Sequence, residues 1–203
     1  MITIVDYGMG NLGSIRNMLK KIGHASEVTA DADRVATATK LILPGVGAFD
    51  AGMARLQQSG LVPVLDERVG RSGIPILGIC LGMQLMTRRS SEGDRPGLGW
   101  IDADTLRFTA ADPALKVPHM GWNIARPVRE GALIAALPDE ARFYFVHSYY
   151  VTCDRPGDVL LTTRHGNEFH SGFQRDNVWG VQFHPEKSHR FGMHLLRNFA
   201  ERC

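Results

Sequence analysis

Short apolar runs alternate with helical segments through the first 88 residues, and this alternation constrains the fold more than any other feature. Apolar runs rich in β-branched and aliphatic residues predict strands at 2–5, 41–43 and 74–79, the first and the last of them buried, and a further strand is expected at 25–29. Helical spacing of apolar residues is found at 12–22, 48–59, 61–72 and 81–88. Strands connected through helices make right-handed crossovers and a parallel sheet covered on both faces. The sequence therefore predicts an α/β fold with a central, mostly parallel sheet flanked by helices.

The second half of the chain has a different pattern. Residues 90–99 are rich in Ser, Gly, Asp and Pro, which favours a loop. Short β-like runs separated by turn residues follow at 104–108, 122–128, 142–146, 148–152, 158–163, 168–174 and 178–183. These runs predict an antiparallel extension of the sheet, and a last helix is expected at 189–200. Because no linker, repeat or low-complexity tract interrupts the chain, we expect a single domain over 1–203.

Composition excludes several classes of protein. The 203 residues include 23 Lys and Arg against 21 Asp and Glu, and this near balance predicts no nucleic-acid partner. No apolar run approaches the ~20 residues that cross a bilayer, and an acid as early as Asp6 argues against a signal peptide. Three cysteines cannot all pair within one chain. We therefore expect a cytoplasmic protein with reduced thiols and no membrane partner.

Cys80 is the candidate nucleophile. It follows a predicted strand, precedes a predicted helix, and has Gly78 and Gly82 two residues away on either side. This is the glycine spacing of a nucleophile elbow, a turn so tight that side chains at the flanking positions would clash. Free N–H groups at the start of the helix favour the thiolate. The other two cysteines have no such setting and are interpreted as structural.

The segment 181–186 supplies a proton carrier for this thiol. Residues two apart in an extended segment face the same side, so we expect His184 and Glu186 to lie side by side. Glu186 would then hold one ring nitrogen of His184 and leave the other for the sulfur. The sequence thus predicts a Cys80–His184–Glu186 triad.

An oxyanion site is expected at a Pro-Gly-Val-Gly segment that follows a predicted strand. Its residues Gly45, Val46 and Gly47 can bring a bare backbone N–H into the site. The N–H of Leu81, next to the nucleophile, is the natural second donor. Because Pro-Gly-x-Gly is also a common turn, this motif is a weak signal by itself.

Together these motifs resemble those of class I (triad) glutamine amidotransferases. Four further segments are similar to the glutaminase subunits of imidazole glycerol phosphate synthase within that family, at 6–11, 118–123, 145–149 and 184–188. The resemblance covers nearly the whole chain. It implies hydrolysis of L-glutamine to glutamate and ammonia through a thioester on Cys80, with His184 protonating the ammonia. No cofactor or metal is expected.

The resemblance also implies roles for other residues. Gln84 and Glu92 match positions that hold the substrate glutamine, and Ser148 and Tyr149 match a segment whose backbone supports it. The Gly45–Val46 peptide matches an oxyanion strand that reorients for activity, which the conformational freedom of glycine allows.

A partner follows from the same resemblance. It is a (β/α)₈-barrel cyclase that would form a heterodimer with this chain, raise its low glutaminase activity and carry the ammonia through the barrel. Positions near the docking face match Asn11, Trp122, Tyr144 and Lys187. The ammonia would enter imidazole glycerol phosphate in histidine biosynthesis. Segments 96–102 and 188–193 are also similar to a paralogous branch that supplies ammonia for acetamidino sugars of surface glycans, so the pathway stays open. His165 stands where relatives usually have Tyr.

Three alternatives belong to other classes of protein. Residues 8–13 fit the G-x-G-x-x-G pattern of a dinucleotide-binding module, with Asp31 or Asp33 as its acid, but this leaves the Cys–His pair unexplained. A metal site on histidines 184, 189 and 194 is disfavoured, because five residues turn a helix by about 500°. A cysteine hydrolase acting alone would share the triad and need no partner.

Overall fold

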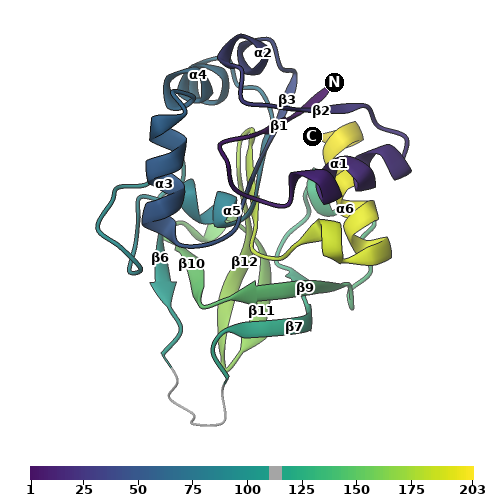
Figure 1. Ribbon diagram of the computed structural model, residues 1–203. Coiled ribbons are helices and arrows are strands. Elements are labelled where there is room, and N and C mark those ends of the chain that lie inside the picture. Colours follow the sequence, from purple (N-terminus) through teal and green to yellow (C-terminus); the bar gives the residue numbers. More distant parts are fainter. Residues whose placement is uncertain (110–115) are drawn as a thin grey trace.

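One large sheet runs through both halves of the chain (Figure 1). The computed structural model describes residues 1–109 and 116–203. Within them the strands of this sheet are β1 (Ile2–Val5), β2 (Ser26–Thr29), β3 (Lys40–Gly45), β4 (Ile76–Cys80), β5 (Arg89–Ser90), β6 (Ala103–Arg107), β8 (Arg126–Pro127), β10 (Tyr149–Cys153), β11 (Val159–His165), β12 (Asn167–Arg175) and β13 (Val178–Val181).

The sheet is parallel in its first part and antiparallel in its second. The strand order is β2-β1-β3-β4-β13-β12-β10-β6-β5, and β11 pairs with β12 and β8. All neighbours from β2 to β13 are parallel. The pairs that follow are antiparallel, except for the short β5–β6 pair. The predicted fold class is confirmed.

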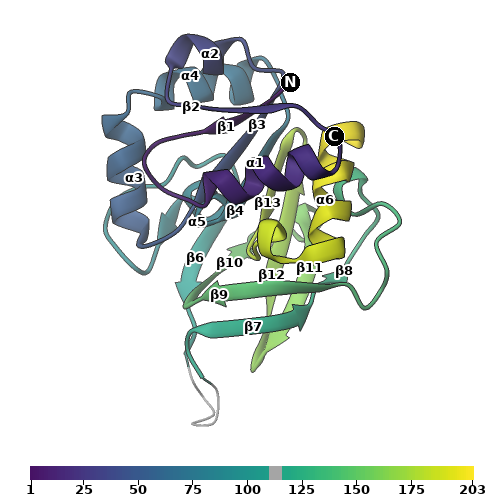
Figure 2. The same ribbon diagram turned by 45° about the vertical axis from the view of Figure 1, so that its right-hand side comes forward.

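Helices cover both faces of the parallel part. They are α1 (Leu12–Lys21), α2 (Ala32–Ala36), α3 (Phe49–Gln58), α4 (Val62–Asp66) with a π-helical turn at Glu67–Arg71, α5 (Leu81–Leu85) and α6 (His189–Arg202). Short 3₁₀ turns lie at Ala132–Ile134, Pro156–Asp158 and Pro185–Lys187. Figure 2 shows α1 and α6 in front of β4 and β13, with α2, α3 and α4 to the other side. No helix in the described part of the chain is long and apolar enough to cross a membrane.

Alternation along the strands divides the core into two layers. Ile4 and Ile42 face α1 and α6 in one apolar cluster, and their neighbours Val5, Leu41 and Leu43 face α3, α4 and α5 in another. The central strands β1, β3 and β4 are therefore buried on both faces, which is why their sequences are nearly continuous apolar runs, whereas the edge strand β2 is mostly polar.

A second, two-stranded sheet consists of β7 (His119–Ile124) and β9 (Arg142–His147). In Figures 1 and 2 it lies at the end of the molecule away from α2 and α4. The backbone N–H of His184 donates to the carbonyl oxygen of Tyr144 in β9, at 2.9 Å. This sheet therefore borders the segment that follows β13.

Three details differ from the sequence-based expectation. The helix expected at 81–88 ends at Leu85, because the Thr87 hydroxyl donates to the Gln84 carbonyl (2.7 Å) and the chain turns into β5. The strand expected at 122–128 begins earlier, at His119, and is divided between β7 and β8. Helix α2 was not predicted, because five residues are too few to show a helical period.

Candidate active site

Cys80 sits on a sharp turn between β4 and α5. It is the last residue of the strand, and α5 begins at Leu81. Its φ of 54° is in a region that residues other than glycine rarely adopt. A Cβ on Gly82 would overlap the carbonyl oxygen of Leu43, and one on Gly78 would stand 2.8 Å from the backbone of Met83. Both glycines are thus required by close backbone approach, as the elbow pattern predicts.

His184 approaches the sulfur from the neighbouring strand. β13 pairs in parallel with β4, and Val181 lies opposite Ile79. His184 follows three residues later and is 2% exposed, and its Nδ1 lies 2.8 Å from Oε1 of Glu186. The side-by-side placement was predicted, but the reason given for it was wrong. Pro185–Lys187 form a 3₁₀ turn, and this turn, not an extended segment, brings the carboxylate back to the ring.

The electrostatics of this pair favour a charged imidazole. Burial by itself would lower the pKa of His184, but its interactions with the Cys80 sulfur and with Glu186 outweigh burial and raise the pKa above its usual value. Apart from the sulfur, Nε2 of His184 has no hydrogen-bond partner among the described residues. The arrangement can therefore hold a thiolate beside an imidazolium and move a proton between the sulfur side and a substrate.

A cavity of about 370 Å³ opens over these groups. Its lining comprises Val46, Gly47, Cys80, Leu81, Gln84, Glu92, Pro118, Val146, His147, Ser148, Tyr149, His184 and Lys187. Most of the residues proposed from the sequence for substrate and oxyanion therefore surround one space. Gly45 is the exception, because it lies within β3 opposite Cys80 and does not line the cavity.

Two segments bring backbone N–H groups to the lining of the cavity. Val46 and Gly47 extend beyond the end of β3, and their N–H groups form no backbone hydrogen bond in the described residues. The N–H of Leu81 belongs to the first residue of α5, where no helical partner exists. These are the donors that an oxyanion beside Cys80 needs.

Glu92 is fixed by a reciprocal contact with the start of α3. One carboxylate oxygen, Oε2, accepts the N–H of Phe49 at 2.8 Å. In return, Asp50 accepts the N–H groups of Asp94 and Arg95, each at 3.1 Å. The loop that carries Glu92 is thus bound to the helix that follows the oxyanion segment, and its other oxygen stays available to a ligand.

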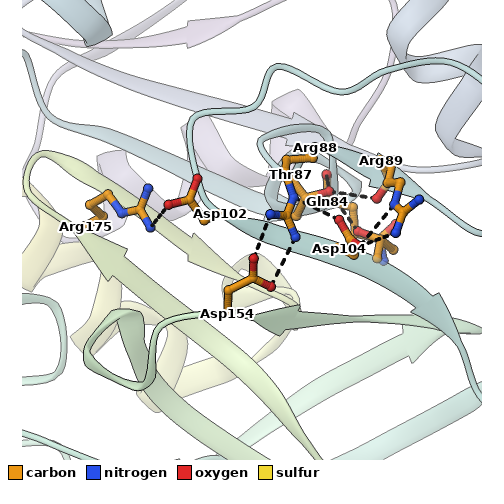
Figure 3. A network of polar contacts seen from close by, with 9 residues as sticks. Gln84, Thr87, Arg88, Arg89, Asp102, Asp104, Asp154 and Arg175 are labelled. Carbon is orange, nitrogen blue, oxygen red and sulfur yellow. Dashed lines mark hydrogen bonds and ion pairs between the residues drawn. The ribbon is translucent and has the colours of Figure 1, made fainter.

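Polar contacts also hold the end of α5, which carries Gln84 (Figure 3). Thr87 bonds to the Gln84 carbonyl and lies 3.1 Å from the Thr105 hydroxyl of β6. Arg88 donates to Asp104 at 3.1 Å and to both oxygens of Asp154. These contacts tie the end of the nucleophile helix to the antiparallel part of the sheet.

Several cavity residues were missed by the sequence analysis. Pro118, Val146 and His147 line the cavity, and Gln182 lies behind it with Nε2 3.8 Å from the Cys80 sulfur. Tyr7 is buried with its hydroxyl unpaired among the described residues. A usable signal existed for His147 and Gln182, because each is a polar residue inside an apolar run beside a proposed site residue.

Three of the four residues proposed for a docking face cluster together. Trp122 and Tyr144 are cross-strand neighbours in the β7–β9 sheet, with ring centroids 6.2 Å apart. The Lys187 ammonium lies 5.7 Å from the centre of the Tyr144 ring. Asn11 is exposed at the start of α1. Met120 and Trp122 are 63% and 47% exposed, which leaves apolar surface on this face.

Two buried histidines near the cavity are held neutral. His147 Nδ1 lies 2.7 Å from the Tyr149 carbonyl, and its Nε2 lies 2.9 Å from Nδ1 of His119. Burial lowers the pKa of His147 to about 3 and that of His119 to about 4, and neighbouring histidines, including His165, add to the effect. Because the carbonyl only accepts, His147 donates through Nδ1 and accepts through Nε2.

These two histidines predict a loss of stability in acid. In the unfolded chain each takes up a proton near pH 6.5, whereas in the folded protein each stays neutral to about pH 4. The free energy of unfolding should therefore fall as the pH drops from 6.5 towards 4, by about 1.4 kcal/mol per pH unit per histidine. Urea unfolding at a series of pH values measures this slope.

A variant isolates the histidine contribution from that of the carboxylates. His119→Asn should show a shallower slope than the wild type, by about one proton, between pH 6.5 and 4. His24→Asn, at the surface beside Glu201, serves as the control. Identical slopes for the wild type and His119→Asn would contradict the assignment.

Comparison with known proteins gives the class of protein to which this sheet and site belong. The family model for class I glutamine amidotransferases matches residues 3–203. This chain belongs to the class I glutamine amidotransferase family, as the motifs predicted.

Curated relatives place the chain within that family. Imidazole glycerol phosphate synthase subunit HisH 2 from Pseudomonas aeruginosa is 51% identical over 201 residues, 99% of each chain. The protein of the same name from Methanococcus maripaludis is 51% identical over 203 residues, 100% of each chain. A solved glutamine amidotransferase from Thermotoga maritima is 16% identical and has the same fold, with a TM-score of 0.72 over 99% of this chain and 96% of that one.

The glycines of the dinucleotide pattern have another explanation. Gly10 has a φ of +105°, and a Cβ there would lie 3.1 Å from Pro44, so the loop is packed against the start of the oxyanion segment. The third glycine of a dinucleotide fingerprint permits close packing of helix and strand. At Gly13 a Cβ would meet nothing within 4 Å among the described residues. The segment therefore lacks the close helix–strand packing that a dinucleotide-binding fingerprint requires of its third glycine.

The histidines of the metal alternative do not converge. His189 stacks on Trp122 with ring centroids 5.3 Å apart, and His194 Nε2 lies 2.8 Å from the Ala135 carbonyl. His184 is paired with Glu186.

Proposed function

We propose that this chain is the glutaminase subunit of an imidazole glycerol phosphate synthase and hydrolyses L-glutamine to glutamate and ammonia. One observation carries the proposal: Cys80 at the end of β4 and His184 shortly after the neighbouring β13 line one cavity with Val46 and Gly47, whose N–H groups form no backbone hydrogen bond in the described residues. The names of the relatives from Pseudomonas aeruginosa and Methanococcus maripaludis support the pathway.

The first half of the reaction forms a thioester. The Cys80 thiolate attacks the carboxamide carbon of glutamine, and the oxygen that becomes negative accepts N–H groups of Val46 or Gly47 and Leu81. The His184 imidazolium then gives its proton to the amide nitrogen. The C–N bond breaks, ammonia leaves, and a glutamyl thioester remains on the sulfur.

The second half regenerates the enzyme. Neutral His184 takes a proton from a water molecule, and the hydroxide attacks the thioester carbon. Glutamate leaves, the sulfur departs as thiolate, and the imidazolium is restored. Glu186 keeps its hydrogen bond to Nδ1 throughout and fixes the ring so that Nε2 faces the reacting atoms.

Four residues of the cavity are proposed to hold the substrate. Glu92 keeps one carboxylate oxygen free of the Phe49 contact, and this oxygen suits the α-ammonium group of an amino acid. Gln84, Ser148 and Tyr149 line the same space and present amide, hydroxyl and backbone groups to the polar atoms of glutamine.

The partner is proposed to be a (β/α)₈-barrel cyclase. The docking face comprises Met120, Trp122, Tyr144 and Lys187, with Asn11 at the start of α1. Exposed aromatic and Met side chains are enriched in protein interfaces, which supports this choice of surface. Lys187 also lines the cavity, so the docked barrel would lie close to the place where ammonia forms.

Glutaminase assays with and without the barrel subunit test the function. Glutamate release by the isolated chain should be slow, and the cyclase with its bound ligand should raise it at least about tenfold, because docking completes the site. With glutamine labelled by ¹⁵N in the amide, the label should appear in imidazole glycerol phosphate, which mass spectrometry detects.

Other outcomes would point elsewhere. Rapid hydrolysis of peptides or esters by the isolated chain would contradict the proposal and favour a cysteine hydrolase that acts alone. If the label is transferred only to an acetamidino sugar, in the presence of a sugar-modifying partner, the histidine pathway is contradicted. The proposed hydrolysis of glutamine is then still supported.

A further inference from the structure

Gln182 is a buried amide beside the nucleophile that the proposed reaction does not use. It follows the last residue of β13, is fully buried, and its Nε2 lies 3.8 Å from the Cys80 sulfur. Along this extended stretch, residues 182 and 184 face the same side while Phe183 enters the core. The segment therefore brings two polar groups to the sulfur, the imidazole and this amide.

The orientation of the Gln182 amide follows from its neighbours. Amide nitrogen and oxygen are distinguished by the hydrogen-bond network around them. The carbonyl of Tyr149 can only accept, so Gln84 must present its NH₂ group there, at 3.2 Å. The same NH₂ group lies 3.0 Å from Oε1 of Gln182. Gln182 thus turns its oxygen to Gln84 and its NH₂ group to the sulfur.

The Tyr149 carbonyl is itself held from a second direction. His147 donates to it through Nδ1 and in turn accepts from His119, whose Nε2 lies 3.1 Å from the Asn123 amide nitrogen. Both rings are neutral near pH 7, so each has one N–H donor and one nitrogen acceptor, as this arrangement of hydrogen bonds requires. Asn123, His119 and His147 each donate towards the Tyr149 carbonyl, and Gln84 donates both to this carbonyl and to Gln182. Every bond in this network is therefore compatible with an NH₂ group of Gln182 that points to the sulfur.

We propose that Gln182 is a hydrogen-bond donor to the Cys80 sulfur and stabilises its thiolate form. A donor at this distance contributes little to a neutral thiol, but a charge-assisted bond to a thiolate is shorter and stronger. The amide therefore acts together with His184 and the start of α5. This inference rests on the proposed function for its catalytic meaning, but the state of the sulfur can be measured without glutamine.

The titration of Cys80 tests the proposal in the full-length chain. The rate of labelling by iodoacetamide is measured against pH and resolved by peptide mass spectrometry, so that the other cysteines are counted separately. Ionisable groups that face the sulfur or its cavity are Tyr7, Glu92, His147, Tyr149, His184, Glu186 and Lys187. All are retained in the variants, so a shift between proteins reports on the amide.

Gln182→Met keeps the length of the side chain and removes the donor. We expect labelling of Cys80 at pH 7 to slow about tenfold and the apparent pKa of the thiol to rise by about one unit. In the complex, kcat for glutamine should fall about tenfold while KM changes less than twofold, because Gln182 does not itself line the cavity and Gln84 keeps its hydrogen bond to the Tyr149 carbonyl. Gln174→Met, in neighbouring β12, is the matched control and should equal the wild type.

Labelling and kcat of Gln182→Met that equal those of the wild type would overturn the proposal. A parallel rise in KM and fall in melting temperature would also overturn it, because this would be the signature of general damage. If Gln182→Met does not fold, Gln182→Glu decides, since its carboxylate cannot donate and should slow labelling further. Absence of glutamate release by the wild-type complex would contradict the proposed function and leave the thiol titration as a valid test.

Discussion

Replacement of Cys80 by alanine is expected to lower glutamine hydrolysis by the complex at least ~10³-fold, because no other group in the cavity can form the thioester. Folding should be preserved. The Cys80 side chain is small, and the polar contacts that alanine removes are those with Gln182 and His184. Glutamate release measures the loss, and cyclase activity supported by added ammonium ions shows that the barrel still docks.

Cys153→Ala is the matched control for this variant. Cys153 is also buried, but it lies in β10, and burial raises the pKa of its thiol to about 12, so it is inert near pH 7. Its alanine variant should hydrolyse glutamine at the wild-type rate. Equal activity of the wild type and Cys80→Ala would show that the nucleophile has been misassigned.

His184→Ala is expected to be nearly as damaging, with a fall in kcat of about 10³-fold or more. In the proposed mechanism the ring both stabilises the thiolate and gives a proton to the departing ammonia. Two measurements separate these roles: iodoacetamide labelling of Cys80 should slow at pH 7, and glutamate release should fall further than labelling does. His194→Ala, whose ring contacts the Ala135 carbonyl away from the cavity, is the control.

Glu186→Gln completes this series. A neutral amide can still bond to Nδ1 of His184, so the ring keeps its position while the imidazolium loses its paired charge. We expect a fall of about 10- to 100-fold, milder than that of His184→Ala. A loss in Glu186→Gln as large as that in His184→Ala would mean that Glu186 does more than orient and stabilise the ring.

Much of the parallel sheet could be predicted, because β1, β3 and β4 are apolar on both faces and end at Gly, Pro or the elbow itself. The antiparallel runs were also found, but the separation of β7 from the large sheet was not. It depends on which strands pair at a distance, and local patterns carry no such information. The five-residue α2 and the early end of α5 depend on side-chain contacts such as that of Thr87.

The sequence predicted those parts of the candidate site whose geometry depends on neighbouring residues in the chain. The glycines around Cys80 are explained by backbone contacts within one turn, and they indicated the nucleophile. Glu186 was paired with His184 for an incorrect reason, because its proximity depends on a 3₁₀ turn. Gln182, His147 and Tyr7 were missed, because their importance arises from groups distant in sequence, such as the Tyr149 carbonyl.

The hydrogen-bond ladder between β4 and β13 has a consequence for any control of this enzyme by a bound protein. Cys80 ends β4 and His184 follows β13 by three residues, so the ladder fixes the two strands from which the sulfur and the imidazole extend. A docking event at the surface has little leverage on the pairing of β4 with β13, but it can reach the backbone of His184, which donates to the Tyr144 carbonyl of the proposed docking face. Adjustable parts lie where regular structure stops, at Val46 and Gly47 beyond β3, where φ of Gly47 is +101°. Communication from outside would therefore reach the proposed reaction through the backbone at Val46 and Gly47 or through the segment that carries His184, while the pairing of β4 with β13 stays unchanged.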